Sequence, residues 1–339
     1  MNRLVASLSV FVVSASPLIA QQPQAEIVSV ERIWDKGKHN AFTDLIRFKN
    51  VFVCSFREAD DHVGGDGQIR ILISSSGNTW VQQALVSEKG VDLRDPKLVA
   101  ADEDLLMMHM GGSIYNGTKV LQSRQPRVAT STDIKYWSPN VKALALGDWL
   151  WRVTWNEQDK KFYGVSYNHH PTTGGPNPEA EWSAKLYSSL DGKVWQLAAN
   201  LNVTGQPNEA TIRFKPDGTG IILMRREAGD RKGVIGVSKP PYRDWTWTPI
   251  QYPLGGPNFI VLPDGSMIAG TRVVGPRFGL FKMTGTTFEP LIPLPSGGDC
   301  SYPGMVWHDG LLHLTYYSSH EGKASIYYAK VKLPWVTTK

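Results

Sequence analysis

Six copies of one short unit follow one another along this chain, and this repeat restricts the possible folds more than any other feature. Each copy consists of an apolar run, a tight turn and a second apolar run. The turns fall near Asn50, Glu103, Asp159, Asp217, Asp264 and Asp309, at intervals of 53, 56, 58, 47 and 45 residues. The last three turns are Asp-Gly pairs, which are a strong signal for a β-hairpin. The pattern predicts a hairpin in every unit.

Further strand signals follow most of these hairpins. The segments "ILISSSGNTW", "VATSTDIKYW" and "LYSSLDGKVW" each combine an apolar strand, a turn and a tryptophan. Their tryptophans Trp80, Trp137 and Trp195 are 57 and 58 residues apart, so each unit has about four short strands. We find no convincing amphipathic helix. The sequence therefore predicts an all-β fold, a six-bladed β-propeller, in which the N-terminal strand Glu26 to Trp34 closes the ring as the outer strand of the last blade.

The N-terminus has the pattern of an export signal. Arg3 is followed by an apolar stretch from Leu4 to Ala15 and by small residues up to Ala20. The stretch is too short to span a bilayer. We therefore predict a signal peptide over residues 1–20, a single propeller domain over residues 26–339, and a secreted or periplasmic protein without a membrane span.

Composition excludes some partners. The net charge is +5, but lysine and arginine are scattered without a run, so a nucleic-acid partner is not expected. The histidines show no ligand spacing, and no metal or cofactor is expected.

Cys54 and Cys300 could pair in an exported protein or could be buried free thiols, and both alternatives stay open.

Polar residues recur at one end of the predicted hairpins. The start of each unit's first strand and the end of its second strand should meet at the same mouth of the central channel, so Tyr302 and Glu321 should both lie there. Arginines and carboxylates together indicate an anionic ligand with acid–base groups beside it. The predicted positions are Asp44, Arg57, Arg94, Asp95, Trp151, Arg152, Glu209, Arg226, Arg272, Tyr302, His320 and Glu321.

At these positions the chain resembles the sialidase superfamily. The tryptophan-ended turns are similar to the family's Asp-box, and the segment from Tyr302 to Leu333 is similar to the family's last blade. The order of a glutamate, two arginines, a tyrosine and a glutamate resembles the family's catalytic set. The matching positions here are Glu209, Arg226 (or Arg225), Arg272, Tyr302 and Glu321.

The resemblance implies a glycoside hydrolase that removes a terminal acidic sugar. Tyr302 would be the nucleophile and Glu209 its base, because a neutral tyrosine avoids the repulsion between a carboxylate nucleophile and an acidic sugar. Arg226 and Arg272 would bind the substrate carboxylate, and Glu321 would orient an arginine. The family's acid–base aspartate lies in the loop after the second strand of blade one. In this chain Asp61 and His62 fall in that loop, and Asp95 is a further candidate.

One departure from the family leaves two other functions open. The family's first arginine opens blade one, but this chain has "FTDL" there, with Thr43 and Asp44. Arg57 or Arg94 could replace it. The alternatives are a glycan-binding propeller without catalysis, and a polysaccharide lyase with Tyr302 as base.

Each hypothesis predicts a different neighbour for Tyr302. The hydrolase requires a contact between Tyr302 and Glu209, with an acid opposite. The lyase requires a histidine beside Tyr302, and His62 or His320 would serve. The binding propeller requires no paired acid. Trp151 is a possible stacking surface for a sugar in all three.

Overall fold

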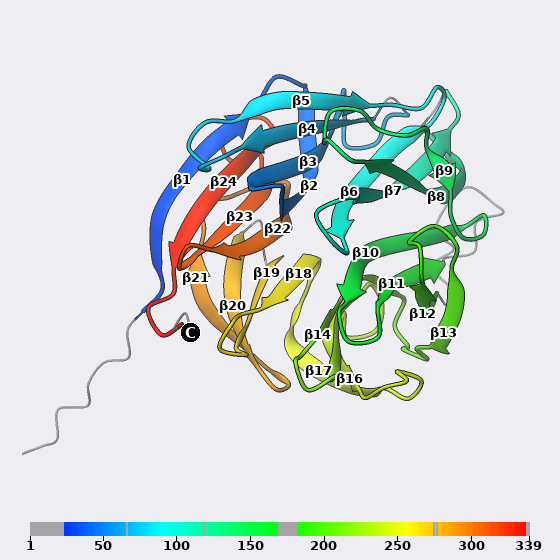
Figure 1. The fold of residues 1–339 in the computed structure, drawn as a ribbon, viewed down its shortest axis with the longest axis vertical. Coiled ribbons are helices and arrows are strands. Elements are labelled where there is room, and N and C mark those ends of the chain that lie inside the picture. Colours follow the sequence, from blue (N-terminus) through cyan, green and yellow to red (C-terminus); the bar gives the residue numbers. More distant parts are fainter. Residues whose placement is uncertain are drawn as a thin grey trace, which may run out of the picture.

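The chain forms a ring of six four-stranded antiparallel sheets (Figure 1), so the predicted β-propeller is confirmed. This computed structural model describes residues 24–65, 67–117, 119–168, 182–273, 275 and 277–336. The predicted signal peptide, residues 1–20, lies outside the described residues. In the described ranges, no helix is long and apolar enough to cross a membrane.

The first three blades follow the predicted repeat, and each contains four consecutive strands. Blade one contains β2 (His39–Phe48), β3 (Val51–Ala59), β4 (Gln68–Ser74) and β5 (Val81–Val86). Blade two contains β6 (Asp92–Ala100), β7 (Leu106–Tyr115), β8 (Leu121–Ser131) and β9 (Val141–Lys142). Blade three contains β10 (Asp148–Asn156), β11 (Lys161–Asn168), β12 (Ser183–Ser189) and β13 (Gln196–Asn200).

The last three blades complete the ring. Blade four contains β14 (Pro207–Phe214), β15 (Gly220–Arg226), β16 (Lys232–Ser238) and β17 (Thr246–Pro253). Blade five contains β18 (Gly255–Val261), β19 (Met267–Arg272), β20 (Phe278–Thr284) and β21 (Thr287–Pro293). Blade six contains β22 (Cys300–His308), β23 (Leu311–Ser318), β24 (Ser325–Lys332) and the N-terminal strand β1 (Glu26–Trp34).

The ring is closed as the sequence predicts. Strand β1 pairs with β24 in an antiparallel register that runs from Glu26 opposite Lys332 to Trp34 opposite Ile326. The outer edge of blade six therefore comes from the other end of the chain. This pairing removes an open sheet edge and links the first blade to the last.

A β-bulge lies at the same level of all six innermost strands. In each, two residues stand opposite one residue of the second strand, where the register shifts. The bulges are at 42–43, 95–96, 151–152, 208–209, 256–257 and 302–303. The first bulge residue has a positive φ in Phe42, Asp95, Gly256 and Tyr302. A bulge re-aims side chains, and here it does so six times around one channel.

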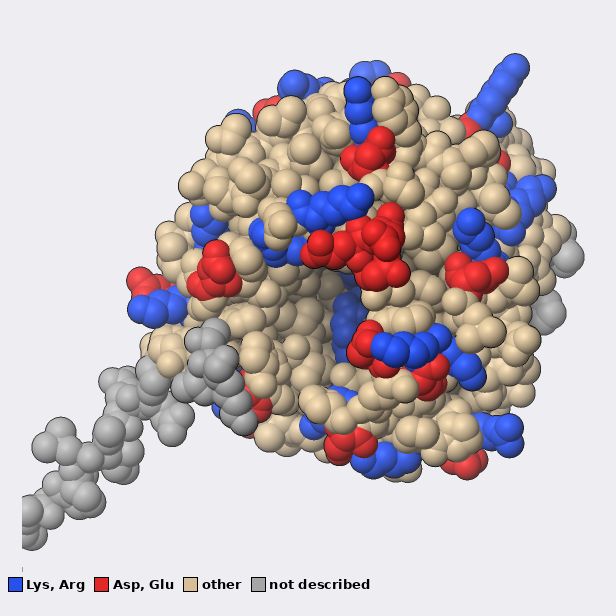
Figure 2. Space-filling model, viewed as in Figure 1, with Lys and Arg blue, Asp and Glu red and all other residues tan. Residues whose placement is uncertain are grey.

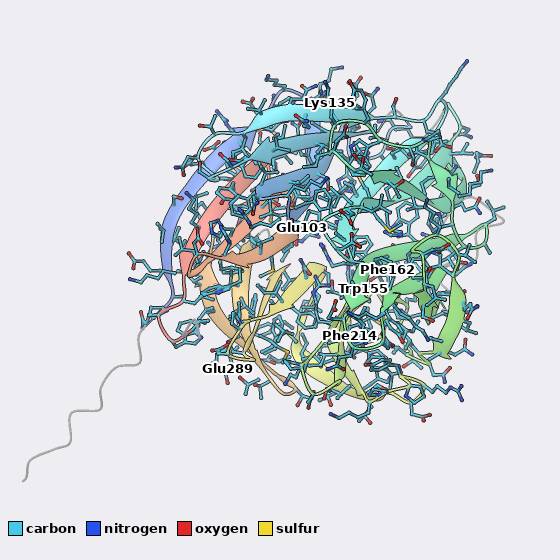
Figure 3. The ribbon with its side chains drawn as sticks, viewed as in Figure 1. Glu103, Lys135, Trp155, Phe162, Phe214 and Glu289 are labelled. Atoms are coloured by element: carbon cyan, nitrogen blue, oxygen red, sulfur yellow. The ribbon has the colours of Figure 1, made fainter. Side chains whose placement is uncertain are left out.

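The channel thus has two different ends, which we call the bulge mouth and the turn mouth. The turn mouth lies at the hairpin turns of the innermost strands. There a cavity of about 780 Å³ is lined by residues such as Trp155, Arg213 and Trp307. Figure 3 shows Trp155, Phe214 and Glu103 around the channel, and Figure 2 shows a hollow at the centre of the ring with basic side chains inside. The candidate catalytic residues lie instead at the bulge mouth.

Apolar side chains from neighbouring blades fill the space between the sheets. Cys54 on β3 and Cys300 on β22 are both buried in these layers as free thiols. Of the two alternatives that the sequence left open, the structure therefore favours unpaired cysteines. Burial raises the pKa of the Cys300 thiol to about 11, which keeps it protonated and unreactive at neutral pH.

Candidate active site

A hydrogen-bonded pair of Tyr302 and Glu209 lies at the centre of the bulge mouth. The Tyr302 hydroxyl donates to Oε1 of Glu209 at 2.5 Å. Each residue belongs to a bulge, Tyr302 on β22 and Glu209 on β14, so two blades bring together residues that are 93 positions apart. The contact that the hydrolase hypothesis requires is present. The Tyr302 hydroxyl meets a carboxylate here, and not the histidine that the lyase hypothesis requires.

The second oxygen of Glu209 is also bound. Oε2 accepts hydrogen bonds from Nη1 of Arg225 at 3.0 Å and from the backbone N–H of Gly256 at 2.9 Å. Glu209 is 6 % exposed, so these donors stabilise a carboxylate that is largely removed from water. They leave Oε1 directed at Tyr302, which is the arrangement that a base for the phenol needs.

Burial and charge keep the Tyr302 phenol neutral. Burial raises the pKa of Tyr302 well above its ordinary value, the negative charge of Glu209 raises it further, and Arg225 opposes both effects. The phenol therefore carries its proton at any physiological pH. It becomes nucleophilic only when the proton moves to Glu209.

Tyr302 rests on a buried layer. The ring centroid of Trp151 lies 5.6 Å from that of Tyr302, and Nζ of Lys97 lies 5.8 Å from the Tyr302 ring. Thr43 donates to the backbone oxygen of Tyr302 at 2.7 Å. Gly256 completes the layer, because a Cβ there would lie 2.7 Å from Cδ2 of Tyr302. These contacts fix the ring in one orientation.

A carboxyl group from blade two faces the same site. Asp95 occupies a bulge position and is 9 % exposed. Burial raises the pKa of Asp95 above that of an ordinary aspartate, while the positive charges of Arg94 and Lys97 oppose this effect. A buried carboxyl that retains its proton to higher pH is suited to act as a general acid.

A cavity of about 400 Å³ opens to solvent on the blade-four and blade-five side, and four arginines line it: Arg225, Arg226, Arg231 and Arg272. The Arg272 side chain is 30 % exposed, and its Nη1 lies 3.8 Å from Oδ1 of Asp299. Arg225 bridges Glu209 and Glu227. Guanidinium groups beside an open cavity can bind a carboxylate through charge-assisted hydrogen bonds.

The structure corrects the prediction for Arg226. Its Nε donates to the backbone oxygen of Lys232 at 2.7 Å and its Nη2 contacts Asp230 at 2.5 Å. Adjacent residues of a strand point to opposite faces, and Arg225 is the one opposite the 208–209 bulge. Arg225, the alternative that the sequence left open, is therefore the arginine that reaches Glu209.

Arg57 does not fill the place of the missing blade-one arginine, whereas the Arg94 guanidinium lies 4.9 Å from the ring centroid of Phe42, in the blade-one bulge, so this alternative for Arg94 stays a prediction. Arg57 is fully buried, and its Nε and Nη2 bind the carboxylate of Asp92 at 2.7 and 3.0 Å. Each guanidinium also binds the loop after β3: Nη1 of Arg57 donates to the backbone oxygen of Asp61, and Nη1 of Arg94 to that of His62, each at 2.8 Å. Both arginines position this loop, and Arg57 cannot reach a ligand.

Asp44, Arg152 and Trp151 lie below the site and are buried. Nη1 of Arg152 contacts Oδ1 of Asp44 at 2.5 Å inside the channel. Oδ2 of Asp44 accepts the backbone N–H of Leu98 at 2.7 Å. Their exposed fractions are 4 % for Arg152, 1 % for Asp44 and 2 % for Trp151, so in this structure they offer little surface for the predicted contact with substrate. They support Tyr302 from beneath.

Glu321 and His320 lie away from the bulge mouth. Glu321 accepts hydrogen bonds from Arg32 on the outer strand β1 at 3.0 Å and from Tyr327 at 2.9 Å. His320 packs on the ring of Tyr327. The loop after β23 therefore turns outward, and the prediction that Glu321 joins Tyr302 and orients a substrate-binding arginine is wrong.

In the loop after β3, only one of the two predicted residues faces the site. Asp61 is exposed and pairs with Lys119 at 2.8 Å. Nδ1 of His62 lies 2.8 Å from Oδ2 of Asp299. Asp299 and its second partner, His39, were not predicted from the sequence, and neither was the contact of Arg225 with Glu209.

The missed residues share one position relative to the bulges. His39 and Asp299 both stand three positions before the first residue of a bulge. Asp92 and Asp148 have the same offset in blades two and three. Because the bulges are visible only in the strand registers, the sequence by itself does not mark this offset.

Comparisons with known proteins support the fold. No protein-family model matches this chain, and no curated protein sequence matches it. A protein of unknown function from Dyadobacter fermentans has a similar structure, with a TM-score of 0.79, 18 % identity, and coverage of 92 % of this chain and 100 % of that one.

Two groups of enzymes have similar structures. The sialidase of Trypanosoma rangeli in complex with sialic acid has a TM-score of 0.68 and 12 % identity over 91 % of this chain, which spans 59 % of that chain's length. An α-L-arabinofuranosidase from Fusarium graminearum has a TM-score of 0.69 and 14 % identity, with coverage of 92 % and 99 %. Identities this low show a shared propeller fold and leave function to be argued from the site.

Proposed function

We propose that this protein is an exported exo-acting glycoside hydrolase that removes a terminal acidic sugar through Tyr302. The observation that carries the proposal is the 2.5 Å hydrogen bond between the Tyr302 hydroxyl and Glu209. A non-catalytic binding propeller has no need for a buried phenol aimed at a buried carboxylate. Two of the similar structures are glycoside hydrolases, which agrees with the proposal.

The site supports a two-step reaction with retention. Glu209 takes the phenolic proton as Tyr302 attacks the anomeric carbon, and Asp95 gives its proton to the leaving oxygen as the glycosidic bond breaks. In the second step Asp95 takes a proton from water as the water oxygen bonds to the anomeric carbon. The bond between that carbon and the Tyr302 oxygen breaks, and Glu209 returns the proton to the Tyr302 oxygen. Arg225 and Arg272 bind the substrate carboxylate beside the reacting carbon.

The first test concerns the substrate charge. Fluorogenic glycosides of keto-acid sugars (sialic acid and its relatives), of uronic acids and of neutral sugars such as arabinofuranose would be compared, each acid beside its methyl ester. We expect release from a keto-acid glycoside and a loss of about 10- to 100-fold in kcat/KM for its ester, because the ester loses a charge-assisted contact with arginine. Release from neutral sugars alone, or equal rates for acid and ester, would overturn the proposed substrate class.

The pH profile tests Asp95. The group must be protonated to act as the acid, so kcat/KM should fall as the pH rises through its pKa, which burial has raised. In Asp95→Asn this alkaline limb should disappear. The rate should fall by about 10²- to 10⁴-fold for a sugar leaving group and much less for an activated aryl leaving group.

A matched aspartate provides the control. Asp60 is exposed and pairs with Lys38 at 3.0 Å on the surface, so Asp60→Asn should keep the profile of the parent. If Asp61→Asn removed the alkaline limb and Asp95→Asn kept it, the acid would belong to the loop after β3.

A further inference from the structure

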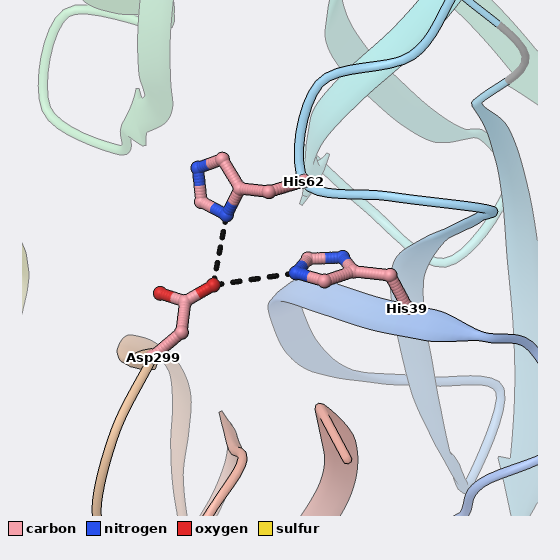
Figure 4. A group of neighbouring side chains, drawn as sticks. All are labelled: His39, His62 and Asp299. Atoms are coloured by element: carbon pink, nitrogen blue, oxygen red, sulfur yellow. Dashed lines mark hydrogen bonds and ion pairs between the residues drawn. The ribbon is translucent and has the colours of Figure 1, made fainter.

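Two imidazoles and a carboxylate converge at the edge of the bulge mouth (Figure 4). Nε2 of His39 lies 3.3 Å and Nδ1 of His62 lies 2.8 Å from the same atom, Oδ2 of Asp299. All three atoms lie within 4.8 Å of one another. We propose that His39, His62 and Asp299 form a binding site for a divalent transition-metal ion of the Zn²⁺ type.

The three residues come from separate segments that the fold brings together. His39 begins β2, His62 follows β3, and Asp299 precedes β22, so blades one and six both contribute. The backbone oxygen of His62 is bound by Arg94 at 2.8 Å, and the backbone N–H of Asp299 by Ser319 at 2.9 Å. The positions of the donors are thus fixed by the scaffold before any ion binds.

The spacing suits a small coordination sphere. Zn²⁺ binds imidazole nitrogen at about 2.0–2.1 Å and carboxylate oxygen at about 2.0–2.2 Å, which places neighbouring ligand atoms roughly 3.4 Å apart in a tetrahedron. The distance from His39 to Asp299, 3.3 Å, is close to this value, and the distance from His62 to Asp299, 2.8 Å, would have to lengthen by roughly 0.6 Å. Nitrogen donors favour Zn²⁺ and related ions over Ca²⁺ or Mg²⁺, which prefer oxygen.

The neighbouring groups also orient the donors. The Tyr317 hydroxyl donates to Oδ1 of Asp299 at 2.6 Å, which leaves Oδ2 directed at both histidines. Nδ1 of His39 is buried and has no hydrogen-bond partner among the residues that the structure describes, so the polar contact of this ring is made through Nε2. Three protein ligands leave at least one coordination position open to water or substrate.

The site is close to the reacting tyrosine. The ring of Phe42 packs against His62 at 5.2 Å and against Tyr302 at 5.1 Å, and Tyr317 lies 5.8 Å from Tyr302. Blade one has Thr43 where the sialidase superfamily has an arginine. A bound cation would place positive charge on this side of the mouth, across from Arg225, and could attract the substrate carboxylate. This last step rests on the proposed function, whereas the metal site does not.

The experiment titrates chelator-treated protein with Zn²⁺ by calorimetry and with Co²⁺ by visible absorption. We expect one ion per chain, with affinity reduced at least about 100-fold in His39→Ala and His62→Ala. Tyr317→Phe should weaken binding by roughly 10-fold, because it only orients a ligand. His320→Ala, which removes an imidazole away from the mouth, should bind as the parent does.

The outcomes separate the site from the proposed function. Absence of stoichiometric binding, or equal affinity in the His62→Ala and His320→Ala variants, would overturn the metal site. Stoichiometric binding that His62→Ala removes would support it even if no acidic glycoside were hydrolysed, in which case the proposed function alone would fail. If the protein hydrolysed an acidic glycoside but bound no ion, the proposed function would stand and the metal site alone would fail.

Discussion

The Tyr302→Phe variant is expected to lose at least about 10³-fold in kcat on any keto-acid glycoside that the parent hydrolyses. The change removes one oxygen atom and keeps the ring, which packs on Trp151 and Phe42. Substrate binding through Arg225 and Arg272 should persist, so KM should change little. Initial rates would measure kcat and KM, and a thermal-shift titration with the sugar acid would measure binding without turnover.

The expected size of the loss follows from how Tyr302 is held. Its phenol is neutral because burial and the charge of Glu209 raise the pKa of Tyr302, and the neutral phenol does not repel a substrate carboxylate. The 2.5 Å contact allows Glu209 to take the proton at the moment of attack. Phenylalanine has no atom that could bond to the anomeric carbon.

Two further variants make the test specific. Glu209→Gln keeps the shape of the base but cannot accept the proton, so it should also lose most of kcat. Tyr327→Phe removes a phenol that bonds to Glu321 away from the mouth and should retain the parent rate. If Tyr302→Phe kept more than a tenth of the parent kcat, Tyr302 would not be the nucleophile, whatever the substrate.

The architecture was predictable because its signals are local. Tight turns such as those at Asp217, Asp264 and Asp309 specify a hairpin within a few residues, and their regular interval indicates repeated blades. Closure by β1 was predictable because one additional strand pattern precedes the first hairpin. None of these inferences needs the distances between residues that are far apart in the sequence.

The site was predictable only in part because bulges change where side chains point. Counting from strand ends placed Tyr302 and Glu209 at the same mouth, and the structure brings these two residues into contact through two bulges. The same counting gave both Arg225 and Arg226, and the resemblance put Arg226 first. A shift of one residue exchanges the two faces of a strand, and the bulge decides for Arg225. The counting also placed Glu321 at the mouth, although the loop that carries it turns towards Arg32.

Burial is the other property that the sequence concealed. Arg57, Arg152 and Arg272 look alike in the sequence. Of these three, only Arg272 lines the 400 Å³ cavity, and the other two are buried. The first two are neutralised by Asp92 and Asp44, which lie 35 and 108 positions away. Such pairs form through tertiary packing, and no local pattern separates them from arginines that bind a ligand.

The buried pair of Arg57 and Asp92 leads to the second large effect. Replacing Arg57 with methionine is expected to lower the free energy of unfolding by about 3–5 kcal/mol, because the change leaves the Asp92 carboxylate buried with a single contact to Arg94 at 3.4 Å. The scaffold is built around this pair: a Cβ on Gly67 would lie 1.8 Å from Oδ1 of Asp92 and 2.4 Å from Nε of Arg57. Urea unfolding followed by tryptophan fluorescence would measure the loss.

Two comparisons decide whether that loss comes from the buried charge. The double variant Arg57→Met with Asp92→Leu removes both charges and should recover most of the stability, since an apolar pair can replace a buried ion pair at little cost. Lys239→Met breaks an exposed pair with Asp217 and should change the free energy of unfolding by less than about 1 kcal/mol. If the double variant were as unstable as Arg57→Met, lost packing and not an uncompensated carboxylate would explain the effect. The loop that carries His62 would then depend on the bulk of Arg57 and not on its charge.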